Sequence, residues 1–176
     1  ARSSGQPDED LFIEYFNQHP EVKLIIAPHV IDENHLVEII RKLKRPYVRY
    51  TRADEKNVRK ADCLIVDCFG LLSSIYRYGE IAYIGGGFGV GIHNTLEAAV
   101  YGIPVIFGPK YQKFQEAVQL LEAKGAFSVK DYEELKTLLD RMLTDEVFLR
   151  ESGMNASNYV TGNAGATDKI MSMINF

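Results

Sequence analysis

The residues best suited to chemistry lie in a loop with five glycines in seven positions, Gly85–Gly91. The loop follows an apolar run, Ile81–Ile84, and leads into a segment of helical character. Glycine has no Cβ atom, so backbone amides can approach a ligand closely, and the start of a helix supplies N–H groups for an anion. We therefore expect this loop to hold a phosphate or carboxylate, with the candidate contacts Gly85, Gly86, Gly87, His93, Asn94 and Glu97.

A purely structural interpretation of the same residues stays open. Asn94 and Glu97 have the spacing of an N-cap and its capping-box partner, which would only start a helix. His93 suits a ligand contact and a hydrogen bond to the backbone equally well. The spacing of the glycines differs from both GxGxxG and GxxxxGK[ST], so a standard dinucleotide site or P-loop is not indicated.

Other loops that follow apolar runs carry further candidates. After Cys63–Asp67, amides near Gly70 and Leu71 and the hydroxyl of Ser73 could hold a phosphate, although a routine strand-to-helix connection is slightly favoured. Two weaker candidates, His29 and Lys110, follow the runs that end at Pro28 and Pro109. A solvated side chain is the commoner outcome for such a lysine.

No other pattern in the chain indicates catalysis. There is no GxSxG elbow and no evident nucleophile. Cys63 and Cys68 lack the further partners of a zinc site, so we expect free thiols in a reducing cytosol, no metal and no cofactor. The acids Asp8–Asp10 favour a helix start, and we give them no function. His19 and His35 are expected to be solvated.

Short apolar segments alternate with helical patterns along the chain, which predicts a Rossmann-like, doubly wound α/β domain with a parallel sheet of about six strands. In such sheets, ligands gather at the carboxyl ends of the strands. The expected strands are Val22–Ala27, Tyr47–Tyr50, Cys63–Asp67, Ile81–Ile84, Val105–Phe107 and Ala126–Val129. The expected helices are Asp8–Gln18, Glu33–Lys44, Leu71–Tyr78, Thr95–Tyr101, Phe114–Lys124, Tyr132–Leu143, Glu146–Tyr159 and Ala166–Ile174.

Composition narrows the function classes. The chain has 176 residues, of which 46% are apolar and 25% charged, as in an ordinary globular domain. Its net charge of −4 argues against nucleic acid as a partner. The opening residues Ala1–Pro7 have the composition of a loop, and the chain reads as a single domain cut from a longer, two-domain protein. Residues 144–176 are expected to form a helical tail that packs outside the sheet or reaches a missing neighbour.

Several of these segments together resemble the nucleotide-sugar-binding half of GT-B glycosyltransferases. The match is closer to the 3-deoxy-D-manno-octulosonic acid (Kdo) transferases of lipid A assembly in lipopolysaccharide biosynthesis. It rests on Asp67–Gly70, on Gly85–Glu97 with its His-Asn-x-Leu-Glu combination, and on Gly102–Val105 and Gly108–Pro109. The resemblance covers most of the chain.

The resemblance implies a donor, CMP-Kdo, lying between the loops at Gly70 and Gly86. Glu97 would face the ribose, and His93 and Asn94 would line the sugar or phosphate. The general base and the site for the lipid A precursor would lie in an N-terminal domain outside these residues, so this fragment alone would be inactive. The full-length protein would work at the cytoplasmic face of the bacterial inner membrane, with this domain soluble in the cytoplasm.

Two other function classes remain. Another GT-B glycosyltransferase, or a nucleotide-sugar epimerase, would keep the same loops and use a UDP-sugar. A non-catalytic Rossmann-like interaction domain would bind no nucleotide. An NAD-dependent oxidoreductase is least favoured, because the glycine fingerprint is missing.

Overall fold

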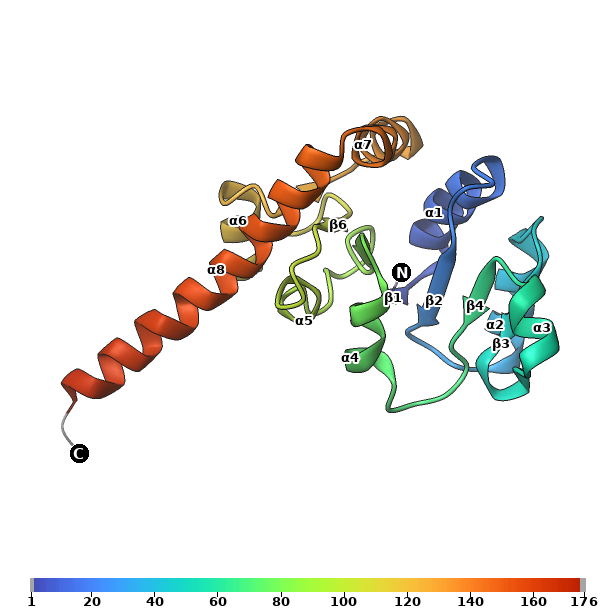
Figure 1. Cartoon of the computed structure of the whole chain (residues 1–176), viewed down its shortest axis with the longest axis horizontal. Helices are drawn as coiled ribbons and strands as arrows, with labels where there is room; N and C mark the ends of the chain where they lie inside the picture. Colours follow the sequence, from blue (N-terminus) through green and yellow to red (C-terminus); the bar gives the residue numbers. More distant parts are fainter. Residues whose placement is uncertain (1, 175–176) are drawn as a thin grey trace.

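A computed structural model of the chain shows seven parallel strands in one sheet, in the order β3-β4-β2-β1-β5-β6-β7 (Figure 1). The structure describes residues 2–174, apart from the side chains of residues 2–4 and 166–168. The predicted doubly wound α/β fold is confirmed. The strands are β1 (Arg2–Ser4), β2 (Leu24–Pro28), β3 (Tyr47–Arg49), β4 (Cys63–Ile65), β5 (Ala82–Ile84), β6 (Val105–Phe107) and β7 (Ala126–Ser128).

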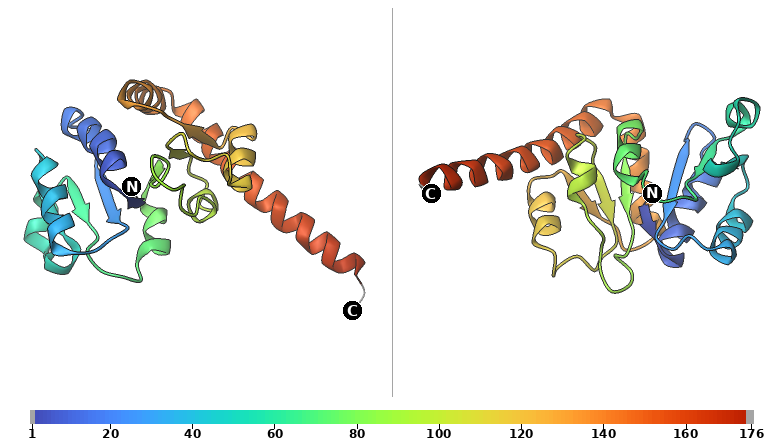
Figure 2. Two further views of the ribbon diagram at one scale, coloured as in Figure 1. Left: turned by 180° about the vertical axis from the view of Figure 1, so that it is seen from behind. Right: turned by 90° about the horizontal axis from the view of Figure 1, so that it is seen from below.

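Helices cover both faces of this sheet (Figure 2). Successive strand residues point to opposite faces, so Tyr83 and Ile106 join one core cluster while Ile84 and Phe107 join the other. This double burial explains why the strands read as continuous apolar runs. The helices are α1 (Gln6–Gln18), α2 (Glu33–Lys42), α3 (Glu55–Lys60), α4 (Leu72–Ile75), α5 (Leu96–Ala99), α6 (Gln115–Glu122), α7 (Tyr132–Thr144) and α8 (Glu146–Met173), with short 3₁₀ turns at Tyr50–Arg52 and Tyr76–Tyr78.

The strand that the composition did not indicate is β1. Arg2 pairs with Ala27 on one side and with Ile84 on the other, so the polar opening residues form a central strand instead of the expected loop. These residues form a strand because β1 pairs with β2 on one side and β5 on the other, and no local sequence pattern reveals such pairing. The chain leaves β1 through α1 toward β2, and leaves β5 through α5 toward β6. The strand order therefore reverses between β1 and β5, which is the topological switch point.

The C-terminal helix is continuous. We expected two helices, Glu146–Tyr159 and Ala166–Ile174, but α8 runs unbroken through Gly162 and Gly165. Its first part packs against α5, α6 and α7, and its far part extends away from the sheet (Figure 1). Described side chains at 161–165 and 169–174 are exposed. Among residues 2–174, no helix is both long enough and apolar enough to span a bilayer.

Candidate functional site

The glycine loop between β5 and α5 folds back on itself. The carbonyl of Gly86 accepts from the amides of Gly89 and Gly91 at 3.0 and 3.1 Å, and the carbonyl of Gly85 accepts from the His93 amide at 3.1 Å. Gly86 has φ +95°, and a Cβ atom there would lie 2.2 Å from the Gly91 carbonyl oxygen. Only glycine fits this position.

The same loop packs tightly on the loop that follows β6. A Cβ atom on Gly87 would lie 2.5 Å from the Gly108 nitrogen, and the Lys110 amide donates to the Gly87 carbonyl at 2.8 Å. Gly91 lies against the Phe114 ring, 2.5 Å from where its Cβ would stand. The glycines are thus needed for close packing between loops, a reason that the sequence alone does not reveal.

Asp8 holds the start of the glycine loop. Its carboxylate is buried and accepts from the Gly86 amide at 3.0 Å, from the Tyr83 hydroxyl at 2.9 Å and from the Gly5 amide at 3.3 Å. Burial and the Asp8 carboxylate both raise the pKa of Tyr83, which stays a hydrogen-bond donor. The sequence pattern assigns the acids Asp8–Asp10 no role beyond the helix start. That interpretation is wrong for Asp8, which links the start of α1, the strand β5 and the glycine loop at the switch point.

Two histidines that the sequence indicates as candidate contacts, His29 and His93, lie side by side at the carboxyl ends of the strands. The rings of His29, after β2, and His93, in the glycine loop, lie 4.5 Å apart between centroids with 31° between their planes. Imidazole nitrogens donate hydrogen bonds to phosphate and carboxylate oxygens. Two such rings side by side suit an anionic ligand.

Asn94 caps the first amides of α5 from one residue before the N-cap position, which Thr95 occupies, and this is close to the structural alternative that the sequence left open. Its Oδ1 accepts from the Leu96 amide at 2.9 Å and from the Glu97 amide at 3.4 Å. Glu97 is half-buried in the first turn of α5, a helix of only four residues, Leu96–Ala99. Both residues stay next to His93 at this edge of the sheet.

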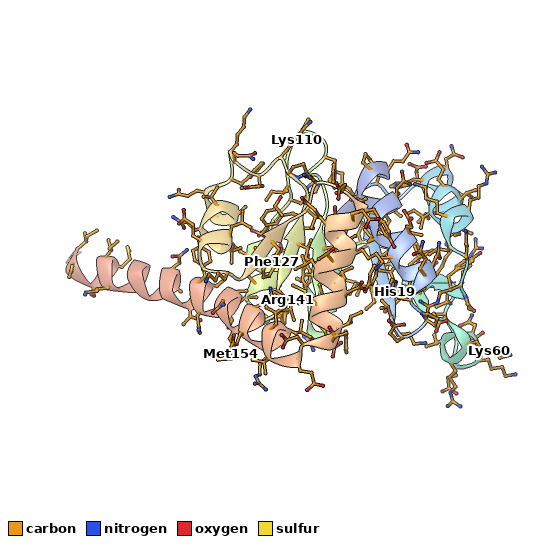
Figure 3. All side chains as sticks on the ribbon, turned by 90° about the horizontal axis from the view of Figure 1, so that it is seen from above. His19, Lys60, Lys110, Phe127, Arg141 and Met154 are labelled. Atoms are coloured by element: carbon orange, nitrogen blue, oxygen red, sulfur yellow. The ribbon has the colours of Figure 1, made fainter. Side chains whose placement is uncertain are left out.

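The Gly70 loop belongs to a different part of the edge, because β2 and β1 separate β4 from β5. Gly70 has φ +89° and open space around it, Leu71 precedes α4, and Ser73 is exposed on α4. The neighbouring hydroxyl of Ser74 donates to the Leu71 carbonyl at 2.9 Å, within the first turn of α4. Lys110 is exposed at the tip of its loop, at the edge of the molecule away from Met154 (Figure 3).

A buried carboxylate fixes the base of the Gly70 loop. Asp67 accepts from the Thr51 amide at 2.9 Å, from the Thr51 hydroxyl at 2.6 Å and from Arg49 Nε at 2.8 Å, and Arg49 also makes a paired contact with Glu33. Burial would raise the pKa of Asp67, but the bonds from Thr51 and Arg49 outweigh it and lower this pKa to about 2. Asp67 therefore joins the loops after β3 and β4.

The two cysteines, Cys63 and Cys68, form no disulfide with each other. Cys63 is buried and Cys68 half-buried, both as free thiols, and burial raises the pKa of Cys63 to about 12. Across residues 2–174, no three His, Cys, Asp or Glu side chains gather as a metal site would require.

An apolar cavity lies at the other end of the strands. It has a volume of about 440 Å³ and is bounded by the start of β2, the start of β5 and the apolar sides of α1 and α7, with lining residues such as Phe12, Leu24, Ile81 and Leu139. Ligands of doubly wound sheets bind at the carboxyl ends of strands instead. The loops at the carboxyl ends of the strands are therefore the candidate site, in preference to this cavity.

Comparison with known proteins identifies related chains. No family model matches this sequence. It is 37% identical over 135 residues to the 3-deoxy-D-manno-octulosonic acid transferase of Aquifex aeolicus, covering 76% of this chain and 37% of that protein. It is 33% identical over 116 residues to the enzyme of that name from Rickettsia bellii, covering 64% of this chain and 28% of that protein. The chain thus spans about a third of the length of these relatives.

A solved structure has a similar fold. The C-terminal CMP-Kdo binding domain of WaaA from Acinetobacter baumannii superposes with a TM-score of 0.77 at 20% identity, covering 90% of this chain and 86% of that one. The chain is therefore a homologue of the 3-deoxy-D-manno-octulosonic acid transferases that has the fold of the C-terminal half of a GT-B glycosyltransferase.

Proposed function

We propose that this chain is the donor-binding domain of a glycosyltransferase that moves Kdo from CMP-Kdo to a lipid A precursor. The observation that carries the proposal is the meeting of His29 and His93 beside the glycine loop, in a chain 37% identical to a Kdo transferase. Nucleotides bind doubly wound domains at this switch point.

The donor's chemistry matches the groups at this edge. CMP-Kdo carries a phosphate and the carboxylate of an acidic sugar, and the two imidazoles would donate hydrogen bonds to these anions. Glu97, half-buried beside them, would accept from the ribose hydroxyls. The remaining candidate contacts are the amides near Gly70 and Leu71, the hydroxyl of Ser73, the glycines Gly85, Gly86 and Gly87, the side chain of Asn94 and the ammonium of Lys110.

The rest of the reaction would fall to the other part of the protein. An inverting transfer needs a general base to take the proton of the acceptor hydroxyl. We place that base and the lipid A precursor in an N-terminal domain, with the full-length enzyme at the cytoplasmic face of the inner membrane. The far part of α8 would contact that domain, because isolated helices with two glycines are marginal in water.

Activity of the full-length protein tests the proposal. With CMP-Kdo and a lipid A precursor, mass spectrometry should detect Kdo addition by the wild-type enzyme and at least tenfold less by Glu97→Gln or His93→Ala, since each loses a hydrogen bond to the donor. Glu38→Gln, an exposed acid on α2, is the control and should keep full activity. Transfer by the 176-residue chain alone, or transfer only from a UDP-sugar, would contradict the proposal.

A further inference from the structure

Two adjacent carboxylates in the first turn of α1 are almost completely buried. Asp8 is 2% exposed and Glu9 is 1% exposed. An acid needs no burial to complement a helix N-terminus, and burying a carboxylate is costly unless hydrogen bonds compensate it. The position of these two side chains therefore calls for another explanation.

The partners of Asp8 lie toward β5. Its Oδ1 accepts from the Tyr83 hydroxyl and its Oδ2 accepts from the Gly86 amide. Gly86 is the residue whose carbonyl closes the glycine loop through the amides of Gly89 and Gly91. Asp8 thus fixes the loop that carries His93.

The partners of Glu9 lie toward β2 and α2. Its Oε1 is 2.8 Å from Nε2 of His35, and Nδ1 of the same ring is 3.0 Å from the carbonyl oxygen of Val30. Each ring nitrogen of His35 therefore faces an oxygen, and the ring links Glu9 to the Val30 carbonyl. Lys42 is a cation beside Glu9, with Nζ 3.9 Å from Oε2. The expectation that His35 would be solvated is wrong, since its side chain is 17% exposed.

Val30 follows His29 directly, so the two links end at the two loops whose histidines meet. We infer that Asp8 and Glu9 are positioning residues, which set the His29–His93 pair for the donor by holding one loop each, Glu9 acting through His35. The inference rests on the proposed function only for the identity of the ligand. A small displacement of the groups that bind a ligand greatly reduces their contribution to the affinity. Residues that hold these groups in place therefore support binding.

Two variants break the links one at a time. Asp8→Asn leaves one acceptor oxygen in place of the two that bond the Gly86 amide and the Tyr83 hydroxyl, and His35→Ala removes the bridge from Glu9 to the Val30 carbonyl. Matched controls sit beside each: Glu14→Gln lies on the same helix with an exposed side chain, and Asn34→Ala is an exposed neighbour of His35. Tyr83→Phe serves as a milder variant should Asp8→Asn fail to fold, because it removes one partner of Asp8 only.

The measurement is NMR on the 176-residue chain, with and without CMP. We expect the nuclear Overhauser contact between the His29 and His93 rings to disappear in both link variants and to persist in both controls. CMP affinity should fall about tenfold in both link variants, as for the loss of roughly one hydrogen bond. The melting temperature of these variants should change only slightly.

Each outcome is decisive. An unchanged ring contact and an unchanged affinity in both link variants would overturn the inference. A purely structural role would lower the melting temperature and leave the affinity of the folded fraction unchanged, which also contradicts it. If the wild-type chain binds no CMP, the proposed function fails at that point, and the ring contact alone still decides whether Asp8 and Glu9 position the histidines.

Discussion

Gly87 and Gly108, on loops that follow neighbouring strands, approach so closely that neither has room for a side chain. A Cβ on Gly87 would lie 2.5 Å from the Gly108 nitrogen, and a Cβ on Gly108 would lie 2.7 Å from the Gly87 carbonyl carbon. The clash involves backbone on both sides, which cannot move as a flexible side chain can. The two loops at the carboxyl ends of β5 and β6 therefore form one packed unit.

This packing predicts that a single methyl group added at Gly87 destabilises the domain. Gly87→Ala should lower the free energy of unfolding by about 1–3 kcal/mol, as overpacking does elsewhere. Gly162→Ala is the matched control, because nothing lies within 4 Å of its Cβ position on α8 and alanine is the better helix former. Urea unfolding followed by circular dichroism measures both. Equal stability of Gly87→Ala and wild type would show that the loops are not packed as described.

The Asp67 cluster predicts a loss of stability in acid. The pKa of Asp67 is about 2 in the folded protein, below the value of roughly 3.9 in an unfolded chain. The contribution of the ionised carboxylate is thus fully present above about pH 4 and is lost as the pH falls through the folded pKa near 2.

Asp67→Asn should remove this contribution. At neutral pH the variant should be less stable by about 1–3 kcal/mol, because Arg49 and Thr51 keep only a weaker partner. Its stability should also depend less on pH between 4 and 2 than that of wild type. Urea titrations across this range measure both effects, with Glu38→Gln as an exposed control. Parallel pH profiles for Asp67→Asn and wild type would contradict the assignment.

Asn94 separates a structural role from a ligand role. Asn94→Ala should destabilise the domain by about 1 kcal/mol through loss of the cap, whereas Asn94→Asp keeps a capping oxygen and should be near neutral in stability. If Asn94 also faces the anionic donor, Asn94→Asp should bind CMP more weakly than wild type by charge repulsion. Calorimetric titration gives the affinity. Wild-type affinity in Asn94→Asp would restrict Asn94 to capping.

We predict that the far part of α8 can be removed without lowering the melting temperature of this chain. Removing residues after Val160 should leave the melting temperature of this chain within about 2 °C of wild type, because the described side chains beyond that point are exposed and bury little apolar area. In the full-length protein, the same truncation should reduce transfer activity, as expected of a helix that contacts the other domain. A large drop in the melting temperature of the short chain would contradict the first expectation.

How far the sequence foretold the structure depended on whether the signal was local. The runs at β2, β4, β5 and β6 are apolar throughout because both faces are buried, so they were predicted within a few residues. β1 was missed because its Arg-Ser-Ser sequence has no strand pattern and its pairing partners lie far along the chain. The continuity of α8 was missed because Gly162 and Gly165 are poor helix formers.

The site followed the same division. The glycine loop, His29 and His93 were identified from residue types alone, and the structure brings the two rings together. The buried partners of that loop were not identified, because Asp8 looks like any acid at a helix start until its distance to Gly86 is known. The burial of Asp8 and Glu9, next to the polar strand β1, would have indicated their role, but only the tertiary structure reveals that burial.

The measurement that tests the central claim most directly is an NMR titration of this chain with CMP, using UDP as the comparison. We predict amide shifts confined to the segments around Gly70, Gly86 and Glu97, together with ring shifts of His29 and His93, and tighter binding of CMP than of UDP. Tighter binding of UDP would assign the domain to another GT-B glycosyltransferase. Shifts that map to the apolar cavity around Leu24 and Leu139, or to α8, would contradict the placement of the donor at the switch point.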